Sequence, residues 1–222
     1  MNTFKGQAAS ISLMLSIPAV SIFYKILNNP GREVNSLVTH LDREIPFIKA
    51  FIIPYLGWYF FILYVLLYLC LKDKKTYYKT LLSYNLGLVV CYLFFFTYQT
   101  TVPRPQPAGD DILTYLVLTL YKIDQPYNCF PSIHCLTSYL MIKAINKSSF
   151  KSKFLYCGVT VCGVLIIIST LFVKQHAILD ALAAILLADI IFKLVCYVDE
   201  ENIMARLKKQ HLPVTTKKRL GI

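Results

Sequence analysis

The chain has 222 residues, of which 56% are hydrophobic and only 16% are charged. Soluble domains carry about 45–50% apolar and about 25% charged residues, so this composition excludes an ordinary soluble enzyme and a disordered or collagen-like chain. The formal net charge of +11 is compatible with nucleic acid, anionic lipid or cytoplasmic loop charge, and the positions of the charges decide between them. Seven cysteines form no C-x-x-C pair and lie mostly in apolar runs, which argues against a disulfide framework or a zinc module.

Six apolar stretches are long enough to cross a membrane, because a spanning helix needs about 20 mostly apolar residues. They are residues 8–27, 47–71, 80–101, 132–149, 154–173 and 175–198. The fourth has the weakest pattern, since it contains His134 and Lys143, but its neighbours require a return crossing. The first is also compatible with a signal peptide, although no A-x-A cleavage site follows it. The sequence therefore predicts an all-α integral membrane protein with a bundle of six transmembrane helices.

The distribution of Lys and Arg orients this bundle. Fifteen of them lie near one set of helix ends and six near the opposite ends. Because these residues accumulate in cytoplasmic loops, we expect both termini in the cytoplasm and the loops 28–46, 102–131 and 173–175 on the outer side. Topology thus accounts for the positive charge without a nucleic-acid partner. No repeat or linker divides the chain, so we expect one domain, 1–222, with a basic cytoplasmic tail from about residue 200.

The outer loop 102–131 is long for a compact bundle, and long loops are often functional. Its apolar residues recur at Ile112, Leu113, Leu116, Val117 and Leu120. This i, i+3, i+4 spacing is typical of an amphipathic helix. We therefore expect a short helix over residues 110–122 that lies on the membrane surface.

Ionisable side chains at membrane depth are costly, so each of them indicates a possible functional site. His176 and Asp180 are four residues apart and share one helix face, where the carboxylate can hold one imidazole nitrogen and leave the other for a substrate. By topology, His134 lies at the same depth, and Arg104 and Lys174 lie on the same side of the membrane. Two imidazoles, one carboxylate and two cations predict a site for a phosphate-bearing ligand.

Structural roles for these residues stay open as alternatives. A satisfied His176–Asp180 pair with unrelated surface charges would have the same spacing. Near the cytoplasmic end of the last span, Asp189 and Lys193 are also four residues apart, and we interpret them as a structural ion pair.

Three segments resemble the signature of the type 2 phosphatidic acid phosphatase superfamily, which reads K-x6-R-P, P-S-G-H and S-R-x5-H-x3-D. The retained positions are Arg104, Pro105, Pro131, Ser132, His134, Ser169, His176 and Asp180. Thr97, Ile133 and Thr170 stand where the family has lysine, glycine and arginine. Order and spacing are kept, and the resemblance covers about residues 40–190. The departures are more similar to the branch that contains inositol phosphorylceramide synthases and their bacterial relatives.

The resemblance implies a mechanism that needs neither a metal nor a cofactor. His176 would attack the phosphorus to form a phosphohistidine, and Asp180 would orient and charge-stabilise its imidazole. His134 would protonate the leaving oxygen and then activate the acceptor. The expected substrate-binding residues are Arg104, Ser132, Ser169 and Lys174. We infer, independently of the resemblance, that Lys174 replaces the missing arginine. Its alternative role is that of an interfacial anchor.

Three functions are compatible with these residues. The first is a lipid phosphate phosphatase that releases inorganic phosphate from a lipid phosphomonoester or pyrophosphate. The second is a phosphotransferase that passes the phospho group to an alcohol, and the third is a non-catalytic membrane carrier or scaffold. A metal site built from the same histidines and aspartate also stays open. Short loops favour a bacterial cytoplasmic membrane with an extracytoplasmic active site, and the sequence makes no prediction of the oligomeric state.

Overall fold

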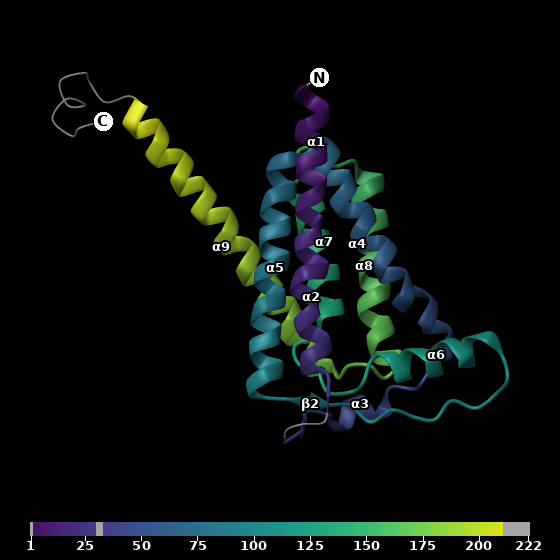
Figure 1. Ribbon diagram of the computed structural model, residues 1–222. Coiled ribbons are helices and arrows are strands. Elements are labelled where there is room, and N and C mark those ends of the chain that lie inside the picture. Colours follow the sequence, from purple (N-terminus) through teal and green to yellow (C-terminus); the bar gives the residue numbers. More distant parts are fainter. Residues whose placement is uncertain (1, 30–32, 211–222) are drawn as a thin grey trace.

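The computed structural model describes residues 2–29 and 33–210, which are mostly helical (Figure 1). The helices are α1 (Asn2–Ser12), α2 (Ser16–Leu27), α3 (His40–Glu44), α4 (Ile52–Lys72), α5 (Lys74–Thr97), α6 (Ile112–Ile123), α7 (Ile133–Lys147), α8 (Lys153–Phe172) and α9 (Ile178–Gln210), with 3-10 turns at Leu13–Leu15 and Lys49–Phe51. Two short strands, β1 (Asn35–Ser36) and β2 (Thr100–Thr101), pair in parallel. The expected basic tail falls partly on α9, which continues to Gln210, and partly on residues 211–222, which lie outside the described residues.

Five helical segments of the described chain are long and apolar enough to cross a membrane. They are Gly6–Leu27, Lys49–Lys72, Lys74–Thr97, Lys153–Phe172 and Ile178–Asp199. The class of an all-α membrane protein thus agrees with the structure, and five of the six expected spans have a counterpart of sufficient length.

The fourth expected span corresponds to α7, which differs from the others. It has 15 residues, and at 1.5 Å per residue it extends about 22 Å, less than the roughly 30 Å of a bilayer core. Ten of its residues are buried, and it packs against α4, α5, α8 and α9. Because protein rather than lipid covers its surface, α7 tolerates polar residues such as Thr137 and Ser138, both fully buried. This explains why its sequence is only moderately apolar.

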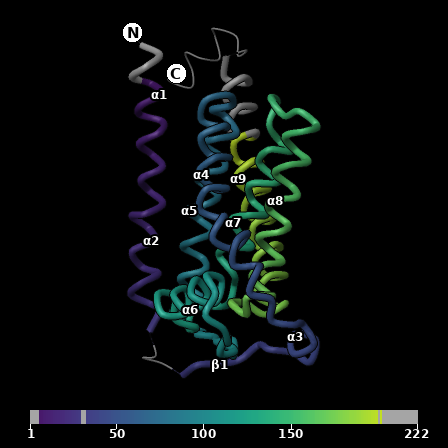
Figure 2. The backbone as a smooth tube through the Cα atoms, turned by 90° about the vertical axis from the view of Figure 1, so that its right-hand side faces the viewer, coloured from purple at the N-terminus to yellow at the C-terminus, as the bar shows by residue number. Residues whose placement is uncertain are grey.

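The first span lies at the edge of the bundle and contacts it through apolar packing, with Ile17 and Val20 against the core, and through hydrogen bonds. Figure 2 shows α1 and α2 at the margin of the bundle, and only 6% of the apolar window in this segment is buried. Tyr77 donates its hydroxyl to the carbonyl of Ser10 at 2.6 Å, and the Asn85 amide donates to the Ser16 hydroxyl at 2.9 Å. Interhelical hydrogen bonds of this kind stabilise helix association where the hydrophobic effect between helices is weak.

The loops that carry the candidate site gather at one end of the bundle. Figures 1 and 2 show α3, α6 and the turn from α8 to α9 at this end, while α1 begins and α9 ends at the opposite end. The short helix expected over residues 110–122 is present as α6, which starts after Asp111 because this side chain accepts from the backbone N–H groups of Leu113 and Thr114, both at 3.1 Å. Figure 1 shows α6 lying across the end of the bundle.

Candidate active site

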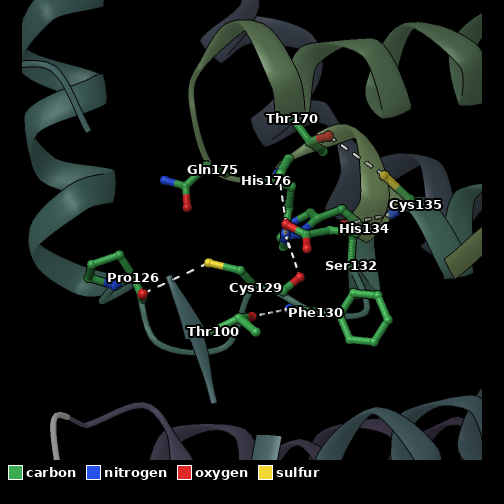
Figure 3. Close-up of polar contacts among 12 residues, drawn as sticks. Thr100, Pro126, Cys129, Phe130, Ser132, His134, Cys135, Thr170, Gln175 and His176 are labelled. Carbon is green, nitrogen blue, oxygen red and sulfur yellow. Dashed lines mark hydrogen bonds and ion pairs between the residues drawn. The ribbon is translucent and has the colours of Figure 1, made fainter. Parts of the chain in front are cut away.

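The turn between α8 and α9 positions His176. The backbone N–H groups of Gln175 and His176 both donate to the carbonyl of Thr170, at 2.9 and 3.2 Å, and Lys174, which precedes them, adopts a left-handed φ of 53°. Nδ1 of His176 lies 2.9 Å from the backbone carbonyl oxygen of Cys129 (Figure 3). A carbonyl only accepts, so Nδ1 carries the proton. In that tautomer Nε2 is the basic nitrogen, and no described residue hydrogen-bonds it.

Asp180 lies beside this imidazole but does not form its closest contact. Its Oδ2 is 3.7 Å from Nδ1 of His176 and accepts a 2.7 Å hydrogen bond from the backbone N–H of Ala177. The carboxylate is buried, and Oδ1 has no partner among the described residues. The sequence predicts that Asp180 orients His176, whereas in this geometry the Cys129 carbonyl makes the orienting hydrogen bond and Asp180 contributes a nearby negative charge.

His134 lies in an aromatic enclosure next to His176. Its ring centroid is 4.5 Å from that of Tyr55 and 4.5 Å from that of Trp58. The two imidazole centroids are 5.9 Å apart. The backbone N–H of Ser132, at the start of α7, donates to the Asp180 carbonyl at 3.2 Å and joins the two histidine-bearing elements. The fold thus brings together the three residues expected to act in catalysis.

Arg104 reaches the same region from the loop after β2. Its guanidinium donates to Oε1 of Gln175 and to the backbone carbonyls of Tyr121 and Asp124, and it lies 4.7 Å from the centre of the Tyr121 ring. The Tyr121 hydroxyl donates to the Val173 carbonyl at 2.7 Å. Burial raises the pKa of Tyr121 to about 12, against the opposing charge of Arg104, so this hydroxyl stays protonated as a donor. Arg104 therefore ties the end of α6 to the turn that carries His176.

Lys174 contacts the first outer loop. Its ammonium donates to the carbonyls of Asp42, at 2.9 Å, and Ile45, at 2.5 Å. Burial lowers the pKa of Lys174, and the Asp42 carboxylate acts in the opposite direction. These contacts join the turn that carries His176 to the first outer loop.

A cavity of about 680 Å³ opens beside these side chains. Its lining includes His176 but not His134, and it combines cations with apolar groups from both outer loops. The lining residues are Ser36, Val38, Asp42, Arg43, Ile45, Pro46, Phe47, Val102, Pro103, Arg104, Pro105, Leu171, Lys174 and His176. A phosphate ester of an apolar alcohol has both characters, charged at one end and apolar at the other.

The two serines expected to bind substrate do not line this cavity. Ser169 is fully buried and donates its hydroxyl to the Ile166 carbonyl at 2.6 Å. The Ser132 hydroxyl accepts from the backbone N–H of Cys135 at 3.3 Å and caps α7. In this structure both serine hydroxyls form hydrogen bonds within their own helices, and other residues line the cavity.

The sequence alone did not indicate that several other residues contribute to this site. The Cys129 carbonyl is a backbone group. Asp42 forms a capping box with Thr39 at the start of α3, a pattern that predicts a helix start but not the contact of Asp42 with the backbone of Ile178. Gln175 is 2% exposed and accepts a hydrogen bond from Arg104. Its position between Lys174 and His176 in the sequence is the only feature that could have indicated this contact.

Among the described residues, no group of three or more His, Cys, Asp or Glu side chains is placed to hold a metal ion. Comparison of the chain with known protein families, with curated proteins and with solved structures finds no match.

Proposed function

We propose that this chain is a membrane lipid phosphate phosphatase of the type 2 phosphatidic acid phosphatase superfamily. In this proposal it hydrolyses a lipid phosphomonoester or pyrophosphate through a phosphohistidine intermediate. The main support is the cavity of about 680 Å³ in which the His176 ring meets Arg104 and apolar side chains. The assignment to this superfamily and the roles of the two histidines rest on the resemblance of the retained motif residues.

In the first step, Nε2 of His176 attacks the phosphorus, the N–P bond forms and the P–O bond to the lipid breaks. The proton on Nδ1 stays hydrogen-bonded to the Cys129 carbonyl, so Nε2 is available as the nucleophile. The phosphorylated imidazole gains positive charge, which the Asp180 carboxylate at 3.7 Å stabilises. In this proposal His134 is the general acid that protonates the leaving lipid oxygen as the P–O bond breaks.

In the second step, neutral His134 takes a proton from water, and the water oxygen attacks the phosphorus. The N–P bond breaks, inorganic phosphate leaves and His176 is regenerated. The 5.9 Å between imidazole centroids allows both rings to reach one phosphoryl group held at their edges. Both steps develop charge on the phosphoryl oxygens, which preplaced cations such as Arg104 stabilise.

A phosphotransferase is the second candidate, and the size of the cavity is compatible with it. At about 680 Å³ the space exceeds one phosphate group, so an alcohol acceptor fits beside the phosphohistidine. The two functions share the first step and differ in the acceptor of the second.

The membrane orientation belongs to the same proposal. We propose that α7 is the sixth crossing, shielded from lipid by its neighbours, and that the cavity faces the outside of a bacterial cytoplasmic membrane, with the basic ends of the helices inside. A protease site added at the N-terminus should be cleaved in inverted membrane vesicles and protected in intact cells. Cleavage in intact cells would reverse the orientation.

The phosphatase is tested by phosphate release from purified protein in detergent with EDTA. The substrates are phosphatidate, phosphatidylglycerophosphate, undecaprenyl pyrophosphate and a sphingoid phosphate, each assayed with and without added alcohols. His176→Ala should abolish release. The matched control is His40→Ala, because the His40 side chain is 84% exposed and does not line the cavity.

Each outcome bears on one part of the proposal. Release that disappears in His176→Ala and persists in His40→Ala supports the phosphatase. Phosphorylated alcohols in place of free phosphate support the transferase. Turnover by His176→Ala excludes the phosphohistidine, and loss of turnover on adding EDTA favours a metal site.

A further inference from the structure

We infer that Arg43 is a further cation that contacts the substrate phosphate at the cavity, in addition to Arg104, and that Lys174 holds the backbone of Arg43 in place. This inference rests on the proposed function, because it names a further binding residue of the same site. It concerns a residue of the first outer loop, outside the three motif segments.

The cations available to the cavity differ in what they already bind. Arg104 donates to Gln175 and to two backbone carbonyls, and Lys174 donates to two carbonyls of the first outer loop. Arg43 also lines the cavity, its side chain is exposed, and no hydrogen bond or ion pair joins it to another described residue. The guanidinium of Arg43 is therefore uncommitted and can form two parallel hydrogen bonds with phosphate oxygens.

The backbone of Arg43 is fixed even though its side chain is free. Lys174 donates to the carbonyls of Asp42 and Ile45, which lie on either side of Arg43 in the chain. Oδ1 of Asp42 accepts a 2.7 Å hydrogen bond from the backbone N–H of Ile178, at the start of α9. Helix α3 is thus attached at several points to the turn that carries His176, and this attachment sets the distance from Arg43 to the nucleophile.

The two acidic residues next to Arg43 in the sequence, Asp42 and Glu44, contact other partners. The Asp42 carboxylate accepts from the backbone N–H and hydroxyl of Thr39, at 2.8 and 2.6 Å, as well as from Ile178. Glu44 lies 3.8 Å from His40, on an exposed face of α3. Neither carboxylate pairs with Arg43, so its charge is available to an anionic ligand.

The first experiment compares Arg43→Ala, Arg43→Lys and the control Lys122→Ala. Lys122 is an exposed cation of the same end of the molecule that does not line the cavity. Arg43→Ala should raise KM for the lipid phosphate about 10-fold, the order of one charge-assisted hydrogen bond at an exposed site, with a smaller change in kcat. Arg43→Lys should restore part of the loss, and Lys122→Ala should leave KM unchanged. All three should keep the wild-type Tm, because both side chains are exposed and Arg43 has no hydrogen bond or ion pair with a described residue to lose.

The second readout is independent of turnover. The chain has one tryptophan, Trp58, whose ring lies 4.5 Å from that of His134, so its fluorescence reports on occupancy of the site. Titration with orthovanadate, an analogue of the phosphoryl group, should give a Kd about 10-fold higher for Arg43→Ala than for the wild type. Lys174→Ala should also raise this Kd. In an Arg43→Ala background it should add nothing, because a residue that acts through Arg43 is not additive with it.

The outcomes separate the inference from the proposed function. Wild-type turnover with unchanged KM and vanadate affinity in Arg43→Ala overturns the inference and leaves the phosphatase standing. Vanadate binding that depends on Arg43 without any turnover supports the anion site and contradicts the phosphatase. Additive effects of Lys174→Ala and Arg43→Ala would assign Lys174 its own contact with phosphate. No vanadate binding by the wild type overturns the anion site itself.

Discussion

Nδ1 of His176 donates to the backbone carbonyl oxygen of Cys129 at 2.9 Å, while Oδ2 of Asp180 lies 3.7 Å from the same nitrogen. The tautomer of the imidazole is therefore set by a group that no side-chain substitution removes. The role left to Asp180 is its charge, together with its hydrogen bond to the backbone of Ala177. These two contributions can be separated experimentally.

Asp180→Asn should lower kcat on the order of 100-fold with little change in Tm. The Asn amide oxygen can still accept from the Ala177 N–H, but the negative charge near the phosphorylated imidazole is lost. A unit charge at about 4 Å in partly buried surroundings is worth up to about 4 kcal/mol, so 100-fold is a conservative expectation. Steady-state kinetics and thermal unfolding in detergent measure both quantities.

Asp180→Ala is the comparison for this variant. It removes the hydrogen bond to the Ala177 N–H as well as the charge, so the protein should also lose about 1 kcal/mol of stability. Wild-type kcat in a folded Asp180→Asn protein would show that the charge has no part in turnover.

Gln175 offers a pair of substitutions with opposite effects. Its Oε1 accepts a hydrogen bond from Arg104, and Gln175→Leu removes this acceptor. The loss should cost about 1–3 kcal/mol of stability, because the half-buried guanidinium group loses a partner. Gln175→Glu keeps the acceptor and adds a negative charge beside the proposed phosphate site. It should keep or raise the Tm and still raise KM several-fold.

Thermal unfolding and KM of both variants, measured in the same detergent, test this separation of effects. If Gln175→Glu binds substrate as well as the wild type, Arg104 and its neighbourhood do not contact the phosphate.

Asp42 should make the stability of the outer end depend on pH. Burial acts to raise its pKa, but hydrogen bonds from Thr39 and from the backbone N–H of Ile178 outweigh it and hold the pKa of Asp42 below its ordinary value of about 3.9. A lowered pKa in the folded state means that the ionised carboxylate contributes stability above about pH 4, and that this contribution is lost as the pH falls further through the folded pKa.

The variant Asp42→Asn isolates this contribution. It should lower the Tm at pH 7, and the difference from the wild type should shrink as the pH falls from about 5 toward 3. A difference that stays constant over this range would mean that ionisation of Asp42 does not stabilise the fold. Other carboxylates titrate in both proteins and cancel in the comparison.

The membrane class, five of the spans and α6 were predictable because long apolar runs and helical periodicity are local properties. The extent of α7, Ile133–Lys147, is also close to the expected stretch 132–149, but its burial by four neighbouring helices was not predictable. A hydropathy pattern assumes that lipid surrounds a span, and α7 violates this assumption.

The candidate site was predictable in its motif residues and not in their contacts. His134, His176 and Asp180 come together as their equal depth indicated. The contacts of Lys174 with Asp42 and Ile45 join segments more than 120 residues apart, and no periodicity reports on such a pairing. Ser132 and Ser169 match the motif, yet their hydroxyls serve helix ends and turns, because a short motif specifies a residue type and not its hydrogen-bond partner.

At the opposite end of the bundle, the expected Asp189–Lys193 ion pair is present and has a third member. Asp189 contacts Lys193 at 2.6 Å and also Lys143 of α7 at 2.7 Å. The Lys143 side chain is 28% exposed and that of Lys193 is 69% exposed, so water can solvate Lys193 far better once the carboxylate is gone. The contact with Lys143 should therefore carry most of the stabilisation.

Asp189→Asn should destabilise the protein by about 1–2 kcal/mol, because it leaves the less exposed Lys143 without its carboxylate. Lys193→Ala removes only the exposed half of the network and should cost less than about 0.5 kcal/mol. Thermal unfolding of the two variants in one detergent gives the comparison. Because this network lies far from the cavity, both variants should keep the wild-type vanadate affinity. Equal losses of stability in the two variants would mean that the contact between α7 and α9 through Lys143 contributes nothing beyond the i, i+4 pair.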